Sequence, residues 1–228
     1  MTPLSEGAGR VGGMDKLTTS EVLDAGLDDW RKLAVGLHAR FRTGDFATGL
    51  AFVAAVGAAA EEADHHPDVK LTYPWVDLQL FTHSASGLTR KDVDLARRVS
   101  ELAREQGVTA EPQVLAEVEL ALDTADIAGL GPFWAALLTG DAGAVDGNDV
   151  DDPNGRVPLL WFQDTDAHET PRQRFHLDVW VPHDVAEARI AAAVAAGGAV
   201  VDDSEAPSFT VLADTDGNRA CVCTCLDR

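Results

Sequence analysis

The sequence predicts an α+β protein made of two domains. Its 228 residues exceed the size of one small domain, and a chain of this length can bury a separate core in each half. In the first half the hydrophobic spacing predicts the element order α-β-β-α-β-β-α, and in the second half a strand-helix-strand pattern occurs twice. We predict a flexible tail at 1–14, a first domain at 15–108, a linker at 109–113 and a second domain at 114–228.

The first helix and the first pair of strands are predicted by a cap and a turn. Thr18 and Thr19 are suitable caps for a short helix that runs to about Ala25. The runs 30–35 and 37–42 have the composition of strands and are separated by a glycine, Gly36. This pattern predicts a β-hairpin with its turn at Gly36.

A longer helix follows and is capped by Asp45. Apolar and small residues recur along it at helical spacing, namely Phe46, Leu50, Val53, Gly57 and Ala60. The ring of Pro67 disfavours helix at the residue before it. The helix is therefore predicted to end with His65 and His66 at its C-terminus.

Two further strands and a helix complete the first half. The runs 69–73 and 75–82 are predicted to be strands, the second with the alternation of a half-buried sheet and with His83 at its end. Thr89 and Asp92 have the spacing of a capping box for a helix that continues through Glu105.

The second half begins near Val114 and has the pattern of an internal duplication. The expected elements are a strand at 116–122, a helix at 132–138, an acidic loop at 140–155, a strand at 157–163, a strand at 175–181, a helix at 184–196 and strands near Ala199, Phe209 and Ala220.

The charge of the chain excludes several classes of partner. Thirty-eight acidic residues against 18 basic ones give a formal charge of −20, which repels nucleic-acid phosphates and anionic lipids. The most apolar run, 51–60, is shorter than the roughly 18 residues that a bilayer span needs. The first residues lack the pattern of a secretory signal. We expect a cytoplasmic protein with neither nucleic acid nor membrane as a partner.

His65, His66 and His83 are the candidate catalytic residues. Histidine is the side chain whose ordinary pKa lies nearest neutrality, so these residues could transfer protons without a metal or cofactor. Glu61 lies one helical turn before His65, and this carboxylate together with the negative end of the helix should favour a protonated His65. The alternatives are surface histidines with no common role, or a trihistidine metal site.

The residues around these histidines resemble the signature of the pterin-4a-carbinolamine dehydratases. The similar segments are 60–68, Tyr73, 80–83 and 87–92, within a resemblance that covers about 17–106. It implies a four-stranded antiparallel sheet with helices on one face. It also implies dehydration of a 4a-hydroxytetrahydropterin to the quinonoid dihydropterin, with no cofactor and no bound metal.

The resemblance also implies roles for individual residues. His65 and His83 would form the acid and base pair, and His66 would bind the pterin. The remaining substrate-binding residues would be Glu61, Asp64, Pro67, Thr82 and Ser84. Ser84 stands where the family often has an acidic residue. Asp92 belongs to the signature too, but its capping position favours a structural role, and we predict it to lie outside the active site.

The second half resembles the glyoxalase and bleomycin-resistance family through the segments 133–138, 158–163, 174–179 and 214–218. This resemblance covers about 114–228 and implies a half-barrel of paired βαβββ modules with a cleft between them. Metal-dependent members carry ligands at positions that correspond here to Glu119, Gln163, His176 and Cys221. Because this set is unusual, a metal-free binding or dimer-forming module is the favoured interpretation.

Other polar residues of the second half are expected to be structural. Arg174 and Asp178 could form part of the cleft, but the alternation of side chains along a strand can equally make them outward-facing partners, and we favour the outward position. The cysteines Cys221, Cys223 and Cys225 alternate along a strand and should be small buried residues without a disulfide.

Three functions stay open on the sequence. The favoured one is a pterin dehydratase fused to a glyoxalase-like domain, and both families imply a homodimer. The second is a metal-dependent lyase or dioxygenase that acts through the second half. The third is a scaffold that binds ligands or partners without catalysis.

Overall fold

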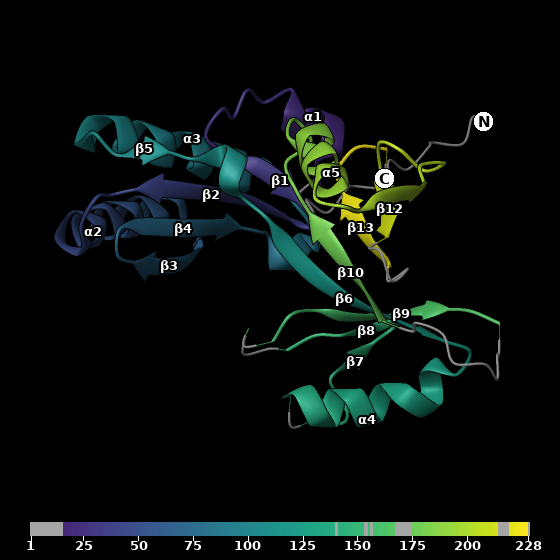
Figure 1. Ribbon diagram of the computed structural model, residues 1–228. Helices are drawn as coiled ribbons and strands as arrows, with labels where there is room; N and C mark the ends of the chain where they lie inside the picture. Colours follow the sequence, from purple (N-terminus) through teal and green to yellow (C-terminus); the bar gives the residue numbers. More distant parts are fainter. Residues whose placement is uncertain are drawn as a thin grey trace, which may run out of the picture. The chain divides into compact units, whose positions relative to one another are not determined.

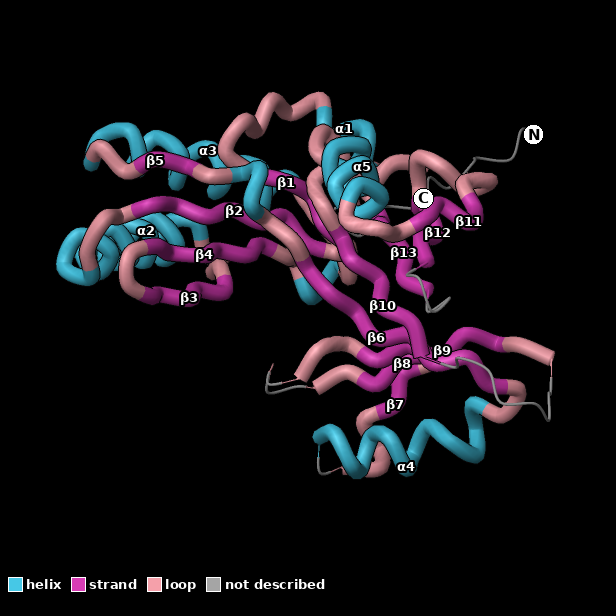
Figure 2. The backbone as a smooth tube through the Cα atoms, viewed as in Figure 1, coloured by secondary structure: helices cyan, strands magenta, loops and turns pink. Residues whose placement is uncertain are grey.

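The computed structural model divides the chain into two compact units, Met1–Pro112 and Gln113–Arg228. Figures 1 and 2 show the helices and strands of each unit. The structure describes residues 16–139, 141–152, 155, 157–166, 175–213 and 219–227. The tail predicted at 1–14 lies outside the described residues.

The N-terminal unit has the predicted element order. Its elements are α1 (Thr19–Leu23), β1 (Arg31–Leu33), β2 (Gly36–Arg42), α2 (Phe46–Ala63), β3 (Asp68–Thr72), β4 (Trp75–Leu80), the short 3-10 helix η1 (His83–Ala85), α3 (Arg90–Gln106) and β5 (Thr109–Ala110). The main strands follow the order β1-β2-β4-β3, and each neighbouring pair is antiparallel. The α+β class and the antiparallel sheet are confirmed.

Gly36 does not form the hairpin turn, contrary to the prediction. The turn lies at Ala34, which has a positive φ of 39°, and Gly36 is the first residue of β2. A Cβ at position 36 would come within 2.9 Å of side-chain nitrogens of His38 and Gln79. A larger residue here would force the side chains of His38 and Gln79 to move, so glycine suits their close approach and is not placed here for a positive φ.

Two further segments, the second long strand and the linker, differ from their predictions. β4 ends at Leu80, so His83 starts η1 and does not close the strand. The segment predicted as a linker contains β5, which pairs with Phe41 and Arg42 of β2 and adds a fifth, very short strand. These pairings join residues far apart in the sequence, which local spacing cannot reveal.

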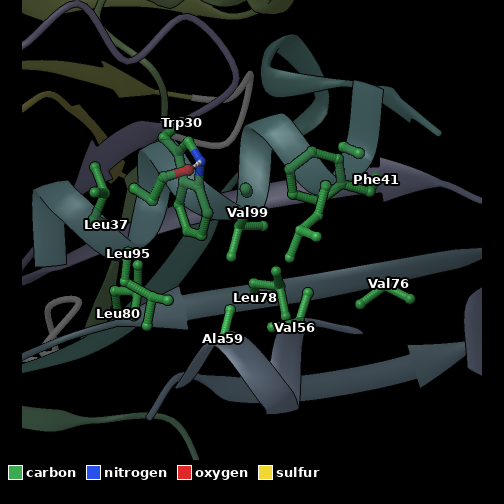
Figure 3. Close-up of a cluster of buried hydrophobic side chains, with 14 of the residues drawn as sticks. Trp30, Leu37, Phe41, Val56, Ala59, Val76, Leu78, Leu80, Leu95 and Val99 are labelled. Atoms are coloured by element: carbon green, nitrogen blue, oxygen red, sulfur yellow. Dashed lines mark hydrogen bonds between the residues drawn. The ribbon is translucent and has the colours of Figure 1, made fainter. Parts of the chain in front are cut away.

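The hydrophobic core lies between the sheet and two helices, α2 and α3. Alternate residues of β2 and β4 are buried on one face, and they pack against helix residues such as Phe52, Val56, Leu95 and Val99. Figure 3 shows how several of these side chains converge. The indole of Trp30 is also buried, and its Nε1 donates to the Ala96 carbonyl at 3.1 Å and to Ser100 Oγ at 3.2 Å. The core is thus closed without an unpaired indole nitrogen.

α2 is the central helix of this core. Asp45 caps it by accepting a hydrogen bond of 2.7 Å from the Thr48 amide, which lowers the pKa of the Asp45 carboxyl. The helix has 18 residues and a mean hydropathy of 1.3, which is enough by length and composition to cross a membrane, contrary to the prediction that no run is long enough. Its buried side, which includes Phe52, Val56 and Ala60, packs in the core. Core packing therefore explains the apolar residues on this side of α2, whereas Phe46 and Leu50 are exposed.

The C-terminal unit consists of two βαβββ modules, as predicted. The first contains β6 (Glu117–Thr124), α4 (Ile127–Thr139), β7 (Val145–Asp146), β8 (Asp149–Val150) and β9 (Leu160–Asp164). The second contains β10 (Phe175–Trp180), α5 (Ala186–Ala195), β11 (Ala199–Asp202), β12 (Phe209–Ala213) and β13 (Arg219–Cys223). All strands form one sheet in the order β11-β12-β13-β10-β6-β9-β8-β7.

The two modules meet at their first strands. β6 and β10 are antiparallel, with Leu120 opposite Leu177, whereas β6–β9 and β10–β13 are parallel.

The helix α4 packs along β7 to β9 (Figure 2). It begins at Ile127, earlier than predicted, because Asp126 Oδ1 accepts a hydrogen bond from the Gly129 amide. The predicted acidic loop contains β7 and β8. Burial raises the pKa of Asp149 in this hairpin, and the nearby Asp146 and Asp151 add to the shift.

Truncation of Phe52 tests the assignment of the core. Phe52 is fully buried, with its ring centroid 5.1 Å from that of Phe41. We expect Phe52→Ala to reduce the free energy of unfolding by about 3–5 kcal/mol. The control is Phe46→Ala on the same helix, because Phe46 is half-exposed. Chemical unfolding measures the loss, and hydrogen exchange should locate it in the N-terminal unit. Equal effects of the two changes would contradict the packing described.

Candidate active site of the N-terminal unit

The end of α2 determines where the first two histidines lie. Asp64 has a left-handed conformation, with φ 46° and ψ 47°. The Asp64 amide donates to the Glu61 carbonyl at 3.3 Å, and the His65 amide donates to the Ala60 carbonyl at 3.1 Å. This is the hydrogen-bond pattern of a Schellman ending, here with aspartate in place of glycine. Lys91 Nζ holds the turn by donating to the Asp64 carbonyl at 3.0 Å.

Asp92 is the central acceptor of the site. Its carboxylate is fully buried, and its Oδ1 lies 2.7 Å from Nε2 of His65. Its Oδ2 accepts from Thr82 Oγ1 at 2.6 Å, from the Thr89 amide at 2.7 Å and from Thr89 Oγ1 at 3.1 Å. One carboxylate therefore joins the residue after α2, the residue before η1 and the start of α3. A buried charge is tolerated only with such a set of partners.

The role predicted for Asp92 was incomplete. The capping box is present, as expected, but the same side chain also contacts His65, which the prediction placed apart from it. One signal in the sequence could have indicated this. The third position of a capping box favours Glu or Gln, and the shorter aspartate suits a carboxylate that must stay buried beside the helix start.

Glu61 does not support His65, contrary to the prediction. Its Oε1 lies 3.1 Å from Nε2 of His66, and both side chains are exposed, Glu61 at 80% and His66 at 57%. The reason is the left-handed Asp64, which takes His65 off the helix axis so that the spacing of one helical turn no longer applies. Asp92 is the carboxylate that pairs with His65 instead.

His83 is the first residue of η1, shortly after the end of β4. It is exposed, and its ring packs edge-on against Phe81 with centroids 5.2 Å apart. The preceding residue, Thr82, is buried, so its hydroxyl serves the Asp92 network. Thr82 therefore links the backbone that carries His83 to the carboxylate that holds His65.

The other predicted substrate-binding residues lie around this network. Asp64 and Ser84 are exposed, and Pro67 is half-buried. The side chain of Asp64 forms an ion pair with Lys91, whose Nζ lies 3.7 Å from Asp64 Oδ2. These residues are accessible to a ligand from solvent.

The four positions compared with metal ligands in the C-terminal unit are only partly assembled. His176 and Cys221 come together, but Gln163 is exposed, and Glu119 accepts a hydrogen bond of 2.5 Å from Trp180 Nε1. Asp178 lies close to His176 and Cys221. It is only 6% exposed, so the prediction that it faces outward is wrong. Arg174 lies outside the described residues. The three cysteines are half-buried or buried and form no disulfide in the described part of the chain, as expected.

Comparison with known proteins identifies the family. The model of the family "Pterin 4 alpha carbinolamine dehydratase" matches residues 15–102, which contain the whole Asp92 network. A protein from Koribacter versatilis is 35% identical over 92 residues, which are 98% of its length and 39% of this chain. The chain belongs to the pterin-4a-carbinolamine dehydratase family.

Other relatives match the same unit of the chain. Proteins from Nocardia farcinica and Natronomonas pharaonis are 42% and 37% identical, over 82% and 97% of their own lengths and 34% and 39% of this chain. All three carry the name "Putative pterin-4-alpha-carbinolamine dehydratase". A crystal structure described as transcriptional coactivator/pterin dehydratase, from Brucella melitensis, is 36% identical over 99% of its chain and 39% of this one, with a TM-score of 0.38.

The C-terminal unit matches a second family. The model described as "Glyoxalase-like domain" covers residues 119–223, which extend from β6 to β13. Both resemblances found in the sequence are therefore confirmed, and the chain is a fusion of the two families.

Removal of the Thr82 hydroxyl tests the buried Asp92 network. Thr82→Val should lower the free energy of unfolding by about 1–3 kcal/mol, because a buried carboxylate loses a donor. Ser84→Ala is the control, since Ser84 is exposed two residues away, and we expect no measurable loss there. Urea unfolding of the full chain measures both. If the two variants were equally stable, Thr82 would not be a significant partner of Asp92.

Proposed function

We propose that the N-terminal unit removes water from a 4a-hydroxytetrahydropterin to give the quinonoid dihydropterin, in the recycling of a tetrahydropterin. The observation that carries this proposal is the Asp92 carboxylate, which bonds His65 and Thr82 at once. It ties a histidine at the end of α2 to the segment that presents His83. Membership of a family whose name is that of a hydro-lyase supports the reaction class.

The reaction requires two proton transfers on one flat ring. The bond between C4a and its hydroxyl oxygen breaks, and that oxygen takes a proton from an acid and leaves as water. A ring nitrogen gives its proton to a base, and its electron pair forms the new double bond. Two imidazoles, one protonated and one neutral, can perform both transfers near neutral pH. His65 and His83 are the proposed pair, and either can be the acid.

His65 is suited to proton transfer through one ring nitrogen. Its Nε2 faces the buried Asp92 oxygen at 2.7 Å, so this nitrogen carries the proton that Asp92 accepts. Nδ1 has no hydrogen-bond partner among the described residues, and it is the atom proposed to exchange a proton with the pterin. A carboxylate that fixes an imidazole in this way selects its tautomer and orientation, as in the serine protease triad.

His66 and Glu61 are the proposed binding residues. Their side chains are both exposed and contact each other at 3.1 Å, so they can meet the polar edge of a ligand without any rearrangement of the core. Asp64, Pro67, Thr82 and Ser84 are proposed to line the same region, Thr82 through its backbone because its hydroxyl is bound to Asp92. The chemistry uses side chains of the protein alone.

The setting of the reaction follows from the sequence. A charge of −20 disfavours binding to nucleic acid or anionic lipid, and the two families imply a dimer. A cytoplasmic homodimer is therefore part of the proposal.

Replacement of both proposed acid–base residues should remove most of the activity. We expect His65→Ala and His83→Ala each to slow dehydration of 4a-hydroxytetrahydropterin by about 10²–10⁴-fold. The absorbance of the pterin follows the reaction. His183→Ala is the control, because His183 lies in the other unit. The proposal fails if the wild-type protein is no faster than the His65→Ala, His83→Ala double variant.

Asp92 is proposed as a positioning residue. Asp92→Asn keeps the shape of the side chain but removes the charge that holds His65, and we expect kcat to fall by about 10²-fold with little change in KM. Asp94→Asn on the same helix, where Asp94 is exposed, should leave both constants unchanged. A parallel rise in KM, or equal behaviour of the two variants, would argue against the positioning role. Circular dichroism checks that both variants are folded.

A further inference from the structure

The sheet of the C-terminal unit has one apolar and one polar face. Leu122, Leu160 and Phe162 pack against α4, and Val179 and Val222 pack with α5, so both helices cover the same face. Side chains alternate along strands, and the opposite face therefore carries a different set from β6, β9, β10 and β13. This set is Glu117, Glu119, Asp123, Trp161, Gln163, His176, Asp178, Trp180, Cys221 and Cys223.

Three residues of this polar face converge. His176 and Asp178 are two apart on β10, and Cys221 of β13 is paired with Asp178 in the parallel ladder. One nitrogen, one carboxylate oxygen and the sulfur all lie within 4.8 Å of one another. The distance from His176 Nε2 to Asp178 Oδ1 is 3.5 Å. This separation is long for a hydrogen bond but suits two atoms that bind the same ion.

The separation of the His176 and Asp178 atoms agrees with that of two ligands of a tetrahedral zinc ion. Zinc binds nitrogen and oxygen at about 2.0–2.2 Å and sulfur at about 2.3 Å, so tetrahedral ligand atoms lie about 3.3–3.8 Å apart. A set of imidazole, carboxylate and thiolate also suits zinc better than magnesium or calcium, which prefer oxygen alone. Three protein ligands would leave a fourth position open to water or a substrate.

The residues behind the cluster orient its donor atoms. Asp123 Oδ1 is buried, makes no hydrogen bond within the described residues, and lies 3.6 Å from Nδ1 of His176. Trp161 Nε1 donates to Asp178 Oδ2 at 3.2 Å, which leaves Oδ1 directed toward His176. The small Ala121 is paired with both Trp161 and His176, so the indole can reach across it. A carboxylate behind a metal-binding histidine is a recurring feature of zinc sites.

We infer that His176, Asp178 and Cys221 bind a divalent cation of the zinc type, with Asp123 and Trp161 as supporting residues. All three ligands come from the second βαβββ module. The site therefore differs from the four positions compared in the sequence, of which Glu119 and Gln163 take no part. It is independent of the pterin chemistry proposed for the N-terminal unit.

Cobalt binding to the full-length, untagged protein tests this inference. Co²⁺ replaces Zn²⁺ in such sites, and a cobalt–thiolate bond gives a charge-transfer absorption in the near ultraviolet. We expect this absorption at one equivalent of Co²⁺, and we expect Zn²⁺ to displace it. Cys221→Ser should abolish it, whereas Cys223→Ser, on the same strand and face, should retain it. The chain has only three cysteines, so metal bound at the N-terminal histidines gives no such signal.

Two further variants test the remaining residues. Asp178→Asn should weaken Zn²⁺ binding more than Asp123→Asn, for which we expect about a tenfold loss because it acts behind the histidine. Calorimetric titration with Zn²⁺ measures both, and thermal unfolding without metal checks the fold. The inference is overturned if the wild-type protein gives no cobalt–thiolate absorption, or if Cys223→Ser removes it and Cys221→Ser does not.

Discussion

The burial of the Asp92 carboxylate is the constraint on which the candidate active site depends. A carboxylate removed from water costs several kcal/mol unless its oxygens are satisfied. Here Oδ2 has three donors from Thr82 and Thr89, and Oδ1 has the ring of His65. These partners come from three separate segments, so the segments must meet in one arrangement for Asp92 to be buried. The position of His65 is therefore fixed by the stability of the fold.

The hydrophobic core makes this meeting possible. α2 and α3 pack on the same face of the antiparallel sheet, and that packing brings the end of α2 and the start of α3 beside the end of β4. The left-handed Asp64 then lets the chain leave α2 abruptly, with one histidine turned inward and the next left in solvent. The two adjacent histidines thus receive different carboxylate partners and different access to solvent, which suits one for proton transfer and the other for binding.

Features that depend on local spacing could be predicted from the sequence. The helices α2 and α3, their caps at Asp45 and Thr89, and the two βαβββ modules all follow from periodicity and cap residues. Other features depend on partners far along the chain. Gly36 lies against the side chain of Gln79, β5 pairs with β2, and Asp92 contacts His65. Asp178 was placed outward because alternation gives two faces but does not say which face is covered.

Both units pair histidine with aspartate, but the state of the carboxylate differs. In the N-terminal unit every Asp92 oxygen has a close hydrogen-bond donor, so the carboxylate is fully engaged and His65 keeps one nitrogen for proton exchange. In the C-terminal unit Asp178 Oδ1 stays 3.5 Å from His176 Nε2, with the Cys221 sulfur nearby. The nitrogen, oxygen and sulfur atoms that converge there are donors suited to a cation. The same two residue types are therefore proposed to serve proton transfer in one unit and metal binding in the other.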